Sequence, residues 1–98
     1  MVDPRKPLLE MLRQLLREIE IYTSQGAGYY TCIPFARRYN KLLAQAQKLF
    51  ADEHGIIDTF DTAPESDPKD PGEKGKYLIG IRVDIGQLIT FLEATREG

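Results

Sequence analysis

The sequence predicts an α+β fold, in which a helical hairpin precedes a two-stranded antiparallel β-ribbon with a long loop and a C-terminal helix. Two segments, residues 8–24 and 34–53, carry apolar residues at helical spacing. A later run, 77–83, is rich in β-branched and aromatic residues, which favour strands. The expected order is therefore α-α-β-β-α, and the length of 98 residues predicts one domain over 1–98.

The first two helices are expected from their apolar stripes. Pro7 stands where a first helical turn tolerates proline, and residues 1–7 before it are expected to be a flexible N-terminus. Pro34 opens the second segment in the same way, and Gly55 follows its end. The stripes are similar in length, so we expect the two helices to pack as an antiparallel hairpin. The stripe residues are Leu8, Leu12, Leu15, Ile19 and Tyr22 in the first helix, and Phe35, Tyr39, Leu42, Ala46 and Leu49 in the second.

The second half of the chain is expected to form the ribbon and the last helix. Residues 56–60 form a short β-type run, and residues 61–76 lose all apolar periodicity among prolines, glycines and charges. We interpret 61–76 as a long loop or a disordered segment that joins strands 56–60 and 77–83. Asp84 is expected to be the N-cap of the last helix, with Gln87 completing a capping box, and this helix should end near Arg96.

Composition and charge restrict the function classes. The chain has 13 basic and 15 acidic residues and a net charge of −2, so it has no overall positive field to attract nucleic acid or an anionic membrane. No apolar run is long enough for a membrane span, and charges interrupt the apolar residues near the N-terminus as no signal peptide allows. The single cysteine fits a reducing compartment. We therefore expect a cytoplasmic, soluble protein.

The second helix is the one predicted helix with a net positive charge, because it has four basic residues and two acidic ones. Arg37, Arg38 and Lys41 follow one another over little more than a turn, with tyrosines nearby. Arginine and lysine bind phosphates and tyrosines stack on bases, so these three residues form a candidate anion- or nucleic-acid-binding site. The order of two helices and a ribbon is also that of a winged-helix protein, in which the long loop would be the wing. A wing that contacts DNA would be basic, whereas this loop is acidic. Nucleic-acid binding is therefore an alternative rather than the preferred function.

A glycine-rich turn, Gly26–Cys32, precedes the same helix. Backbone N–H groups at a helix start can hold an anion, and a cysteine there can become a reactive thiolate. These properties make the turn a second alternative site, for a small anion or for thiol chemistry. A thiol nucleophile needs a base, however, and the one histidine, His54, lies at the far end of the helix. The simpler interpretation is a connecting loop with a small buried cysteine.

No metal or cofactor site is expected. One histidine and one cysteine do not make a zinc site, and the acidic loop lacks the register of a calcium-binding EF-hand. The simpler interpretations are a helix-capping histidine and a solvated loop. The loop acids are Asp58, Asp61, Glu65, Asp67, Asp70 and Glu73.

The preferred functional hypothesis is a non-enzymatic interaction or scaffold protein that works as an oligomer. No catalytic constellation is visible, and the apolar stripes are wider than one small ribbon can cover. Such faces favour association, so we expect a homodimer. The first helix is the expected contributor to its interface, through Leu8, Leu12, Leu15, Leu16 and Ile19.

Overall fold

The protein is an all-helical bundle. In the computed structural model, residues 4–25, 32–50 and 55–95 are described. They form three α-helices, α1 (Arg5–Gln25), α2 (Ile33–Leu49) and α3 (Pro71–Thr95), and a short 3-10 helix, η1 (Ile56–Thr59). None of the residues in these ranges is in a β-strand. The predicted α+β class with its β-ribbon is therefore wrong. The two helices predicted in the first half of the chain are present as α1 and α2, and they pack against each other.

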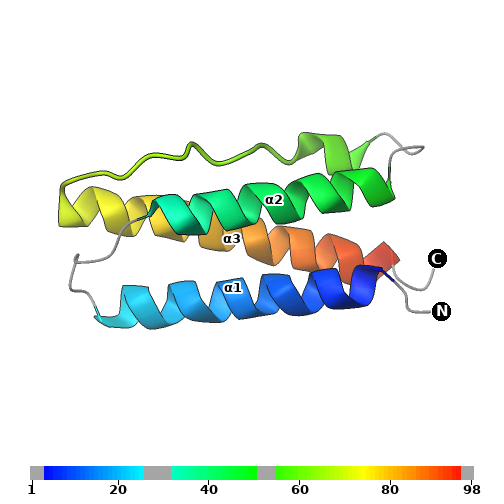
Figure 1. The fold of residues 1–98 in the computed structure, drawn as a ribbon, viewed down its shortest axis with the longest axis horizontal. Coiled ribbons are helices and arrows are strands. Elements are labelled where there is room, and N and C mark those ends of the chain that lie inside the picture. Colours follow the sequence, from blue (N-terminus) through cyan, green and yellow to red (C-terminus); the bar gives the residue numbers. More distant parts are fainter. Residues whose placement is uncertain (1–3, 26–31, 51–54, 96–98) are drawn as a thin grey trace.

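The direction of the helices explains the long connection before α3. Helix α1 runs antiparallel to α2 and α3, which run in the same direction, as the colours of Figure 1 show. The chain must therefore return along the whole bundle before α3 can begin. Residues 60–70 do this as an extended segment, which we call the strap. Its reach, about 36 Å at 3.3 Å per residue, matches the length of α3, about 37 Å for 25 residues.

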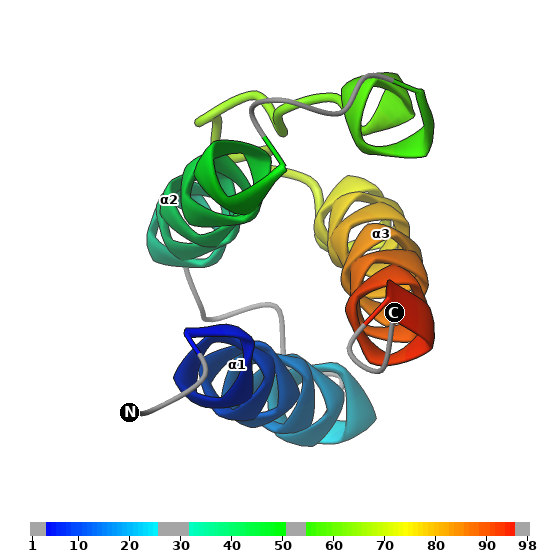
Figure 2. The same ribbon diagram turned by 90° about the vertical axis from the view of Figure 1, so that its right-hand side faces the viewer.

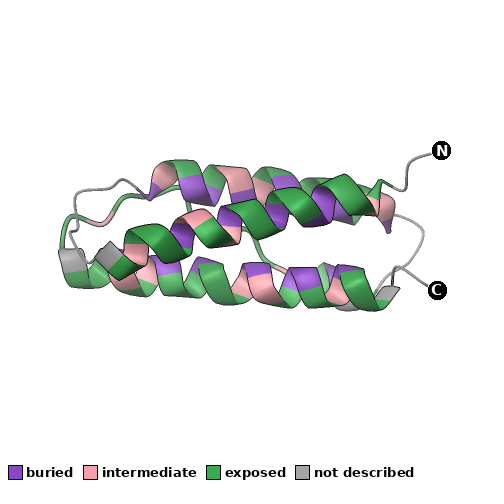
Figure 3. Cartoon of the chain, turned by 90° about the horizontal axis from the view of Figure 1, so that it is seen from below, coloured by how far each residue is buried: buried purple, intermediate pink, exposed green. Residues whose placement is uncertain are grey.

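The core lies between the three helices. Figure 2 shows the bundle end-on, with α1 beneath α2 and α3, and η1 above α3. Buried positions recur along each helix at about one-turn intervals (Figure 3), as expected for amphipathic helices. Helix α3 packs mainly on α1, and the strap and η1 fill the side between α2 and α3. Fully buried side chains include Leu12, Leu15, Ile19, Tyr39, Leu43, Leu78, Ile85, Leu88 and Leu92.

The predicted strand 77–83 is part of helix α3. Its alternation placed Ile79, Ile81 and Val83 on one face, but in α3 only Ile81 is buried, whereas Ile79 and Val83 are exposed. The burial pattern instead follows a heptad that runs through and beyond the segment. Packing on α1 along this heptad overrides the β-propensity of the residues. The buried positions of this heptad repeat are Lys74, Leu78, Ile81, Ile85, Leu88 and Leu92.

Helix α3 starts at Pro71, thirteen residues before the predicted cap Asp84, which lies within the helix. Asp70 caps the helix instead. Its Oδ2 accepts the backbone N–H of Glu73 at 3.2 Å, and its carbonyl oxygen accepts that of Lys74 at 2.9 Å. The sequence Asp70-Pro71-Gly72-Glu73 has an N-cap residue, a proline in the first turn and an acidic residue three positions after the cap. These signals lie inside the segment that was interpreted as a loop.

The other predicted boundaries need smaller corrections. The predicted strand 56–60 is the 3-10 helix η1, entered through Gly55 with a φ of 137°, and Ile57 packs into the core. Helix α2 ends at Leu49 rather than at residue 53, and residues 51–54 lie outside the described ranges. Helix α1 begins at Arg5, so residues 5–7, expected to be flexible, form its first turn, and residues 1–3 lie outside the described ranges.

The predicted loop 61–76 divides into two structures. Residues 71–76 belong to α3, and residues 61–70 are the greater part of the strap. The strap is held along its length by hydrogen bonds from α2 and α3, so it is a packed part of the fold. Within the described ranges, no helix has a stretch long and apolar enough to cross a bilayer.

Candidate functional site

The outer side of α3 exposes large apolar side chains. Ile79 and Val83 are one turn apart and face away from the core, with 52% and 51% of their surface exposed. The same side of the helix carries Gly75, Gly86 and Thr90, since these positions continue the spacing of three and four residues. We call these five residues the outer face of α3. These apolar and small residues form a stripe along one side of the longest helix, on which Ile79, Val83 and Thr90 are exposed and the two glycines are partly buried.

The glycines of α3 have no evident role within the chain. A Cβ atom added at Gly75, Gly80 or Gly86 would meet no atom within 4 Å, and none of the three has a positive φ. A glycine inside a helix costs about 1 kcal/mol of stability relative to alanine. Neither close packing nor backbone geometry within the described residues requires these glycines. A surface that another helix approaches closely would require them at the two positions on the outer face.

Two of the three predicted anion-binding residues are engaged with carboxylates of the chain. Arg38 donates two hydrogen bonds to Glu18 of α1, at 3.0 and 2.9 Å, and Arg37 donates to Glu65 of the strap at 3.1 Å. The hydrogen bond from Arg38 is the main reason that the pKa of Glu18 is lowered, and the bonded carboxylate raises the pKa of Arg38 in return. A phosphate would have to compete with these carboxylates for both guanidinium groups.

Lys41, the third predicted residue, lies beside an open groove between α1 and α2. The groove has a volume of about 270 Å³ and is lined by Met11, Gln14, Arg38, Lys41 and Leu42. Met11 is 55% exposed there. The structure thus brings Arg38 and Lys41 to one groove, while Arg37 faces the strap. This separation divides the basic cluster that the sequence suggested.

Cys32 is buried beside a charged pair. Its backbone N–H donates to Oδ1 of Asp67 at 3.1 Å, and the same oxygen lies 2.5 Å from Nζ of Lys74, which is itself 93% buried. Burial raises the pKa of the Cys32 thiol, which disfavours the thiolate needed for nucleophilic chemistry. The contacts of Asp67 with Cys32 and Lys74 fix the strap to the starts of α2 and α3. Residues 26–31 of the alternative anion site lie outside the described ranges.

A second titratable cluster lies where the strap crosses α2 and α3. The hydroxyl of Tyr39 donates to the carbonyl oxygen of Asp61 at 3.5 Å. Burial and the nearby carboxylates of Asp84 and Asp61 raise the pKa of Tyr39 to about 12. The pKa of Asp84 is also raised, mainly by burial and secondly by Asp61. Tyr39 is therefore neutral at pH 7, whereas ionised Asp84 is less stable in the folded protein than in the unfolded chain, because it is partly buried and lies near Asp61.

The predicted dimer interface lies mostly inside the monomer. Four of its five residues on α1 are buried in the core of one chain, and Leu16 is half-buried against that core. The predicted loop acids have local roles: Glu65 pairs with Arg37, Asp67 with Lys74, and Asp70 caps α3. His54 lies outside the described ranges. The buried interface residues are Leu8, Leu12, Leu15 and Ile19.

In the parts of the chain that the structure describes, no group of three histidine, cysteine, aspartate or glutamate residues could hold a metal ion. Comparison of the chain with protein-family models, curated proteins and solved structures finds no significant match.

Sequence reasoning missed the outer face of α3 because it assigned Ile79 and Val83 to a strand. The signal that could have found it is the helical repeat of small and apolar residues on the side opposite the heptad. This repeat includes Gly75 and Gly86 and becomes visible once the helix start at Asp70 is recognised.

Proposed function

We propose that this protein is a non-enzymatic interaction protein that works as a homodimer through the outer face of α3. The observation that carries the proposal is the exposure of Ile79 and Val83 on a face that also carries Gly75, Gly86 and Thr90. The charged residues Lys76, Arg82 and Glu93 lie beside this stripe. Exposed apolar residues gathered on one face are typical of protein–protein contact sites. Single exposed residues such as Met11 are ordinary, and it is the continuous stripe that distinguishes α3.

The outer face also suits a second copy of itself. In a two-fold dimer, the same surface must supply both projections and hollows. Two antiparallel α3 helices, with the axis near residues 82 and 83, would place Ile79 of each copy against Gly86 of the other and bring the two Val83 side chains together. Glycine at the contact lets helix backbones approach closely, which explains a residue that a single chain does not need.

The remaining features of the chain are compatible with a non-enzymatic role. Cys32 is buried with a raised pKa, and the charged pair beside it is used to hold the strap and two helices together. The proposal needs no cofactor or metal. It includes a cytoplasmic location, supported by the one free thiol of the described chain, which suits a reducing compartment.

The test is the solution mass of the full chain by multi-angle light scattering over a range of concentrations. The unmodified protein is expected to have the mass of a dimer, and Ile79→Asp combined with Val83→Asp is expected to have the mass of a monomer. Charged side chains at these positions would be buried without partners in the dimer, which is strongly unfavourable. Circular dichroism must show unchanged helix content in the variant, since both positions are exposed in the monomer.

The matched control is Met11→Asp, which changes an equally exposed apolar residue on α1. This variant is expected to remain dimeric. A dimer that survives both substitutions on α3, or one that Met11→Asp dissociates, would contradict the assignment of the interface. Measurements at low and moderate salt, with and without a mixed nucleic-acid pool, also test the alternative: a gain in mass with nucleic acid, lost on Arg38→Ala with Lys41→Ala, would support nucleic-acid binding instead.

A further inference from the structure

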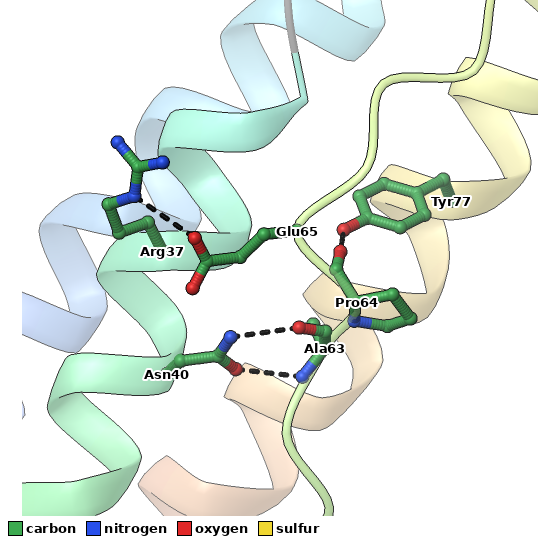
Figure 4. Close-up of polar contacts among 6 residues, drawn as sticks. All are labelled: Arg37, Asn40, Ala63, Pro64, Glu65 and Tyr77. Carbon is green, nitrogen blue, oxygen red and sulfur yellow. Dashed lines mark hydrogen bonds and ion pairs between the residues drawn. The ribbon is translucent and has the colours of Figure 1, made fainter.

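Side chains of α2 and α3 hold the strap as they would hold a bound peptide. The side-chain amide of Asn40 makes two hydrogen bonds to the backbone of Ala63: its Nδ2 donates to the carbonyl oxygen at 2.8 Å, and its Oδ1 accepts the N–H at 2.7 Å. The Tyr77 hydroxyl donates to the carbonyl oxygen of Pro64. Figure 4 shows these groups converging on the strap from the two helices, with Arg37 directed at Glu65.

Most of these contacts recognise an extended backbone rather than a particular sequence. The hydrogen bonds that Asn40 and Tyr77 make to Ala63 and Pro64 involve main-chain atoms of these two residues, so another extended segment could supply the same atoms. Tyr77 also interacts with Ser66 of the strap. Sequence preference comes from Arg37, which pairs with an acidic side chain two residues after Ala63. We call Arg37, Asn40 and Tyr77 the cradle. Backbone recognition combined with one or two side-chain contacts is a common way to bind extended peptides.

The strap is a weakly buried occupant of this cradle. Its residues 61, 62, 64–67, 69 and 70 are exposed, and Ala63 is only partly buried. It has no helical or strand hydrogen bonds of its own. Segments with few buried apolar contacts open at a lower free-energy cost than the core does. At the two ends of the strap, Phe60 packs on Phe91 and Asp67 pairs with the buried Lys74. It is the middle of the strap, residues 61–66, that can leave the cradle while these ends and the three helices stay packed.

We propose that the cradle is a docking site for an extended acidic segment of another protein, and that the strap is the chain's own competitor for it. The partner segment would carry a small residue opposite Asn40 and a glutamate or aspartate two residues later, as the strap does. Because the strap is tethered, its effective concentration at the cradle is in the millimolar range or above, which weakens binding of any partner in trans. This inference does not depend on the proposed dimer, which uses the opposite side of α3.

The test uses a fluorescent peptide with the sequence of residues 60–70 and full-length protein, followed by fluorescence anisotropy. Glu65→Lys in the protein removes the strap's charge pair with Arg37 and should loosen the strap while leaving the cradle unchanged. We expect the peptide to bind this variant at least several-fold more tightly than the unmodified chain. Adding Asn40→Ala should then weaken binding about tenfold, the effect of losing about 1.4 kcal/mol.

A charge-reversed pair gives a second, independent readout. In a chain with Arg37→Glu, a peptide that carries lysine at the position of Glu65 should bind better than the original peptide. Arg37 is an exposed residue, so this variant should retain its helix content. Absence of peptide binding to the Glu65→Lys chain at millimolar concentration, or binding that Asn40→Ala leaves unchanged, would overturn the proposal.

The same experiments distinguish a separate partner from a second copy. If two copies exchanged straps, the dimer mass would fall on Glu65→Lys and would be unaffected by Ile79→Asp. That result would overturn the assignment of the cradle to another protein. A dimer mass that depends on Ile79 but not on Glu65 leaves the cradle open to a partner, as proposed.

Discussion

The ammonium group of Lys74 lies 2.5 Å from Oδ1 of Asp67, and that oxygen also accepts the backbone N–H of Cys32. One carboxylate therefore joins the strap to the first turns of both α2 and α3. Lys74 occupies the first position of the buried heptad of α3, where an apolar residue would be usual. Its charge is tolerated because Asp67 is next to it.

This arrangement predicts unequal effects for the two halves of the pair. Asp67→Ala should lower the free energy of unfolding by about 2 kcal/mol, less than for a fully buried pair because Asp67 is partly exposed. It would leave the buried ammonium of Lys74 and the N–H of Cys32 without this acceptor. Lys74→Met should cost less, because it removes the buried charge and keeps an unbranched side chain in the core. Urea denaturation of both variants measures the difference.

Lys76→Met is the matched control for Lys74→Met, since Lys76 is exposed on the same helix. Its free energy of unfolding should differ from that of the unmodified protein by less than about 0.5 kcal/mol. A larger loss for Lys74→Met than for Asp67→Ala would show that the pair stabilises the fold by itself, contrary to this argument.

Asp84 should make the protein less stable at neutral pH than in mild acid. Its pKa is raised by burial and by Asp61, so the folded state binds a proton more tightly than the unfolded chain does. The contribution of Asp84 to stability therefore increases as pH falls through the raised pKa, and levels off below the unfolded value of about 3.9. Asp84→Asn should stabilise the protein at pH 7, by up to about 1 kcal/mol, and have little effect near pH 3.5.

Asp61→Asn provides a check on the cause of this effect. Removing the Asp61 charge should also stabilise the protein at pH 7, and Asp84→Asn should then give a smaller further gain. Thermal unfolding of the two single variants and the double variant, at both pH values, measures this coupling. Additive effects would contradict a direct interaction between the two carboxylates.

The sequence allowed the first half of the fold to be predicted better than the second half. In α1 and α2 the apolar stripe is the only strong periodicity, and both helices were located to within a few residues. In α3, Ile79 and Val83 are apolar on the outer face, so the segment is apolar on two sides and its helical period is obscured. Alternation from Tyr77 to Val83 then resembled a strand. Recognition of Asp70 as a cap would have corrected the interpretation.

The candidate sites were less predictable because they depend on contacts between distant residues. Arg37 and Arg38 are adjacent in the sequence, yet one faces the strap and the other α1. The pairing of Asn40 with Ala63 follows from the parallel arrangement of α2 and α3, which requires the strap. No local pattern specifies that arrangement.

Alanine at the helical glycines should separate folding from association. Gly80→Ala and Gly86→Ala should each stabilise the monomer by about 0.5–1 kcal/mol, because alanine favours helices and space is open at both positions. Only Gly86 lies on the outer face of α3, so only Gly86→Ala should weaken the dimer. Denaturation at low concentration measures the first effect, and light scattering as a function of concentration measures the second.

Gly80→Ala is the control in this pair, since its position is about 100° around the helix from Ile79. If Gly86→Ala left the dimer as stable as Gly80→Ala does, the close approach of a second helix at Gly86 would be excluded. Loss of stability in either variant would show that the glycine has a role in the monomer.

The cap of α3 should be worth about 1 kcal/mol. Asp70→Ala removes the acceptor of the Glu73 N–H and should lower the free energy of unfolding by this amount, whereas Asp70→Ser should retain most of it. Gly72→Ala alone should lower the free energy of unfolding by less than Asp70→Ala does, because the new Cβ would lie 3.1 Å from Oδ2 of Asp70. Equal stability of Asp70→Ala and Asp70→Ser in urea denaturation would indicate that the side-chain bond contributes nothing.

The thiol of Cys32 should react slowly in the folded protein. The residue is fully buried and its pKa is raised by that burial, so both access and the thiolate fraction are low. Labelling with dithionitrobenzoate at pH 8 should be at least about 100-fold slower than in denaturant, since it requires local opening of the strap and the start of α2. Asp67→Ala should lower the free-energy cost of that local opening and so accelerate labelling, whereas Lys76→Met should not. A rate equal to that of the denatured chain would contradict the burial of Cys32 and restore thiol chemistry as a function for this end of the bundle.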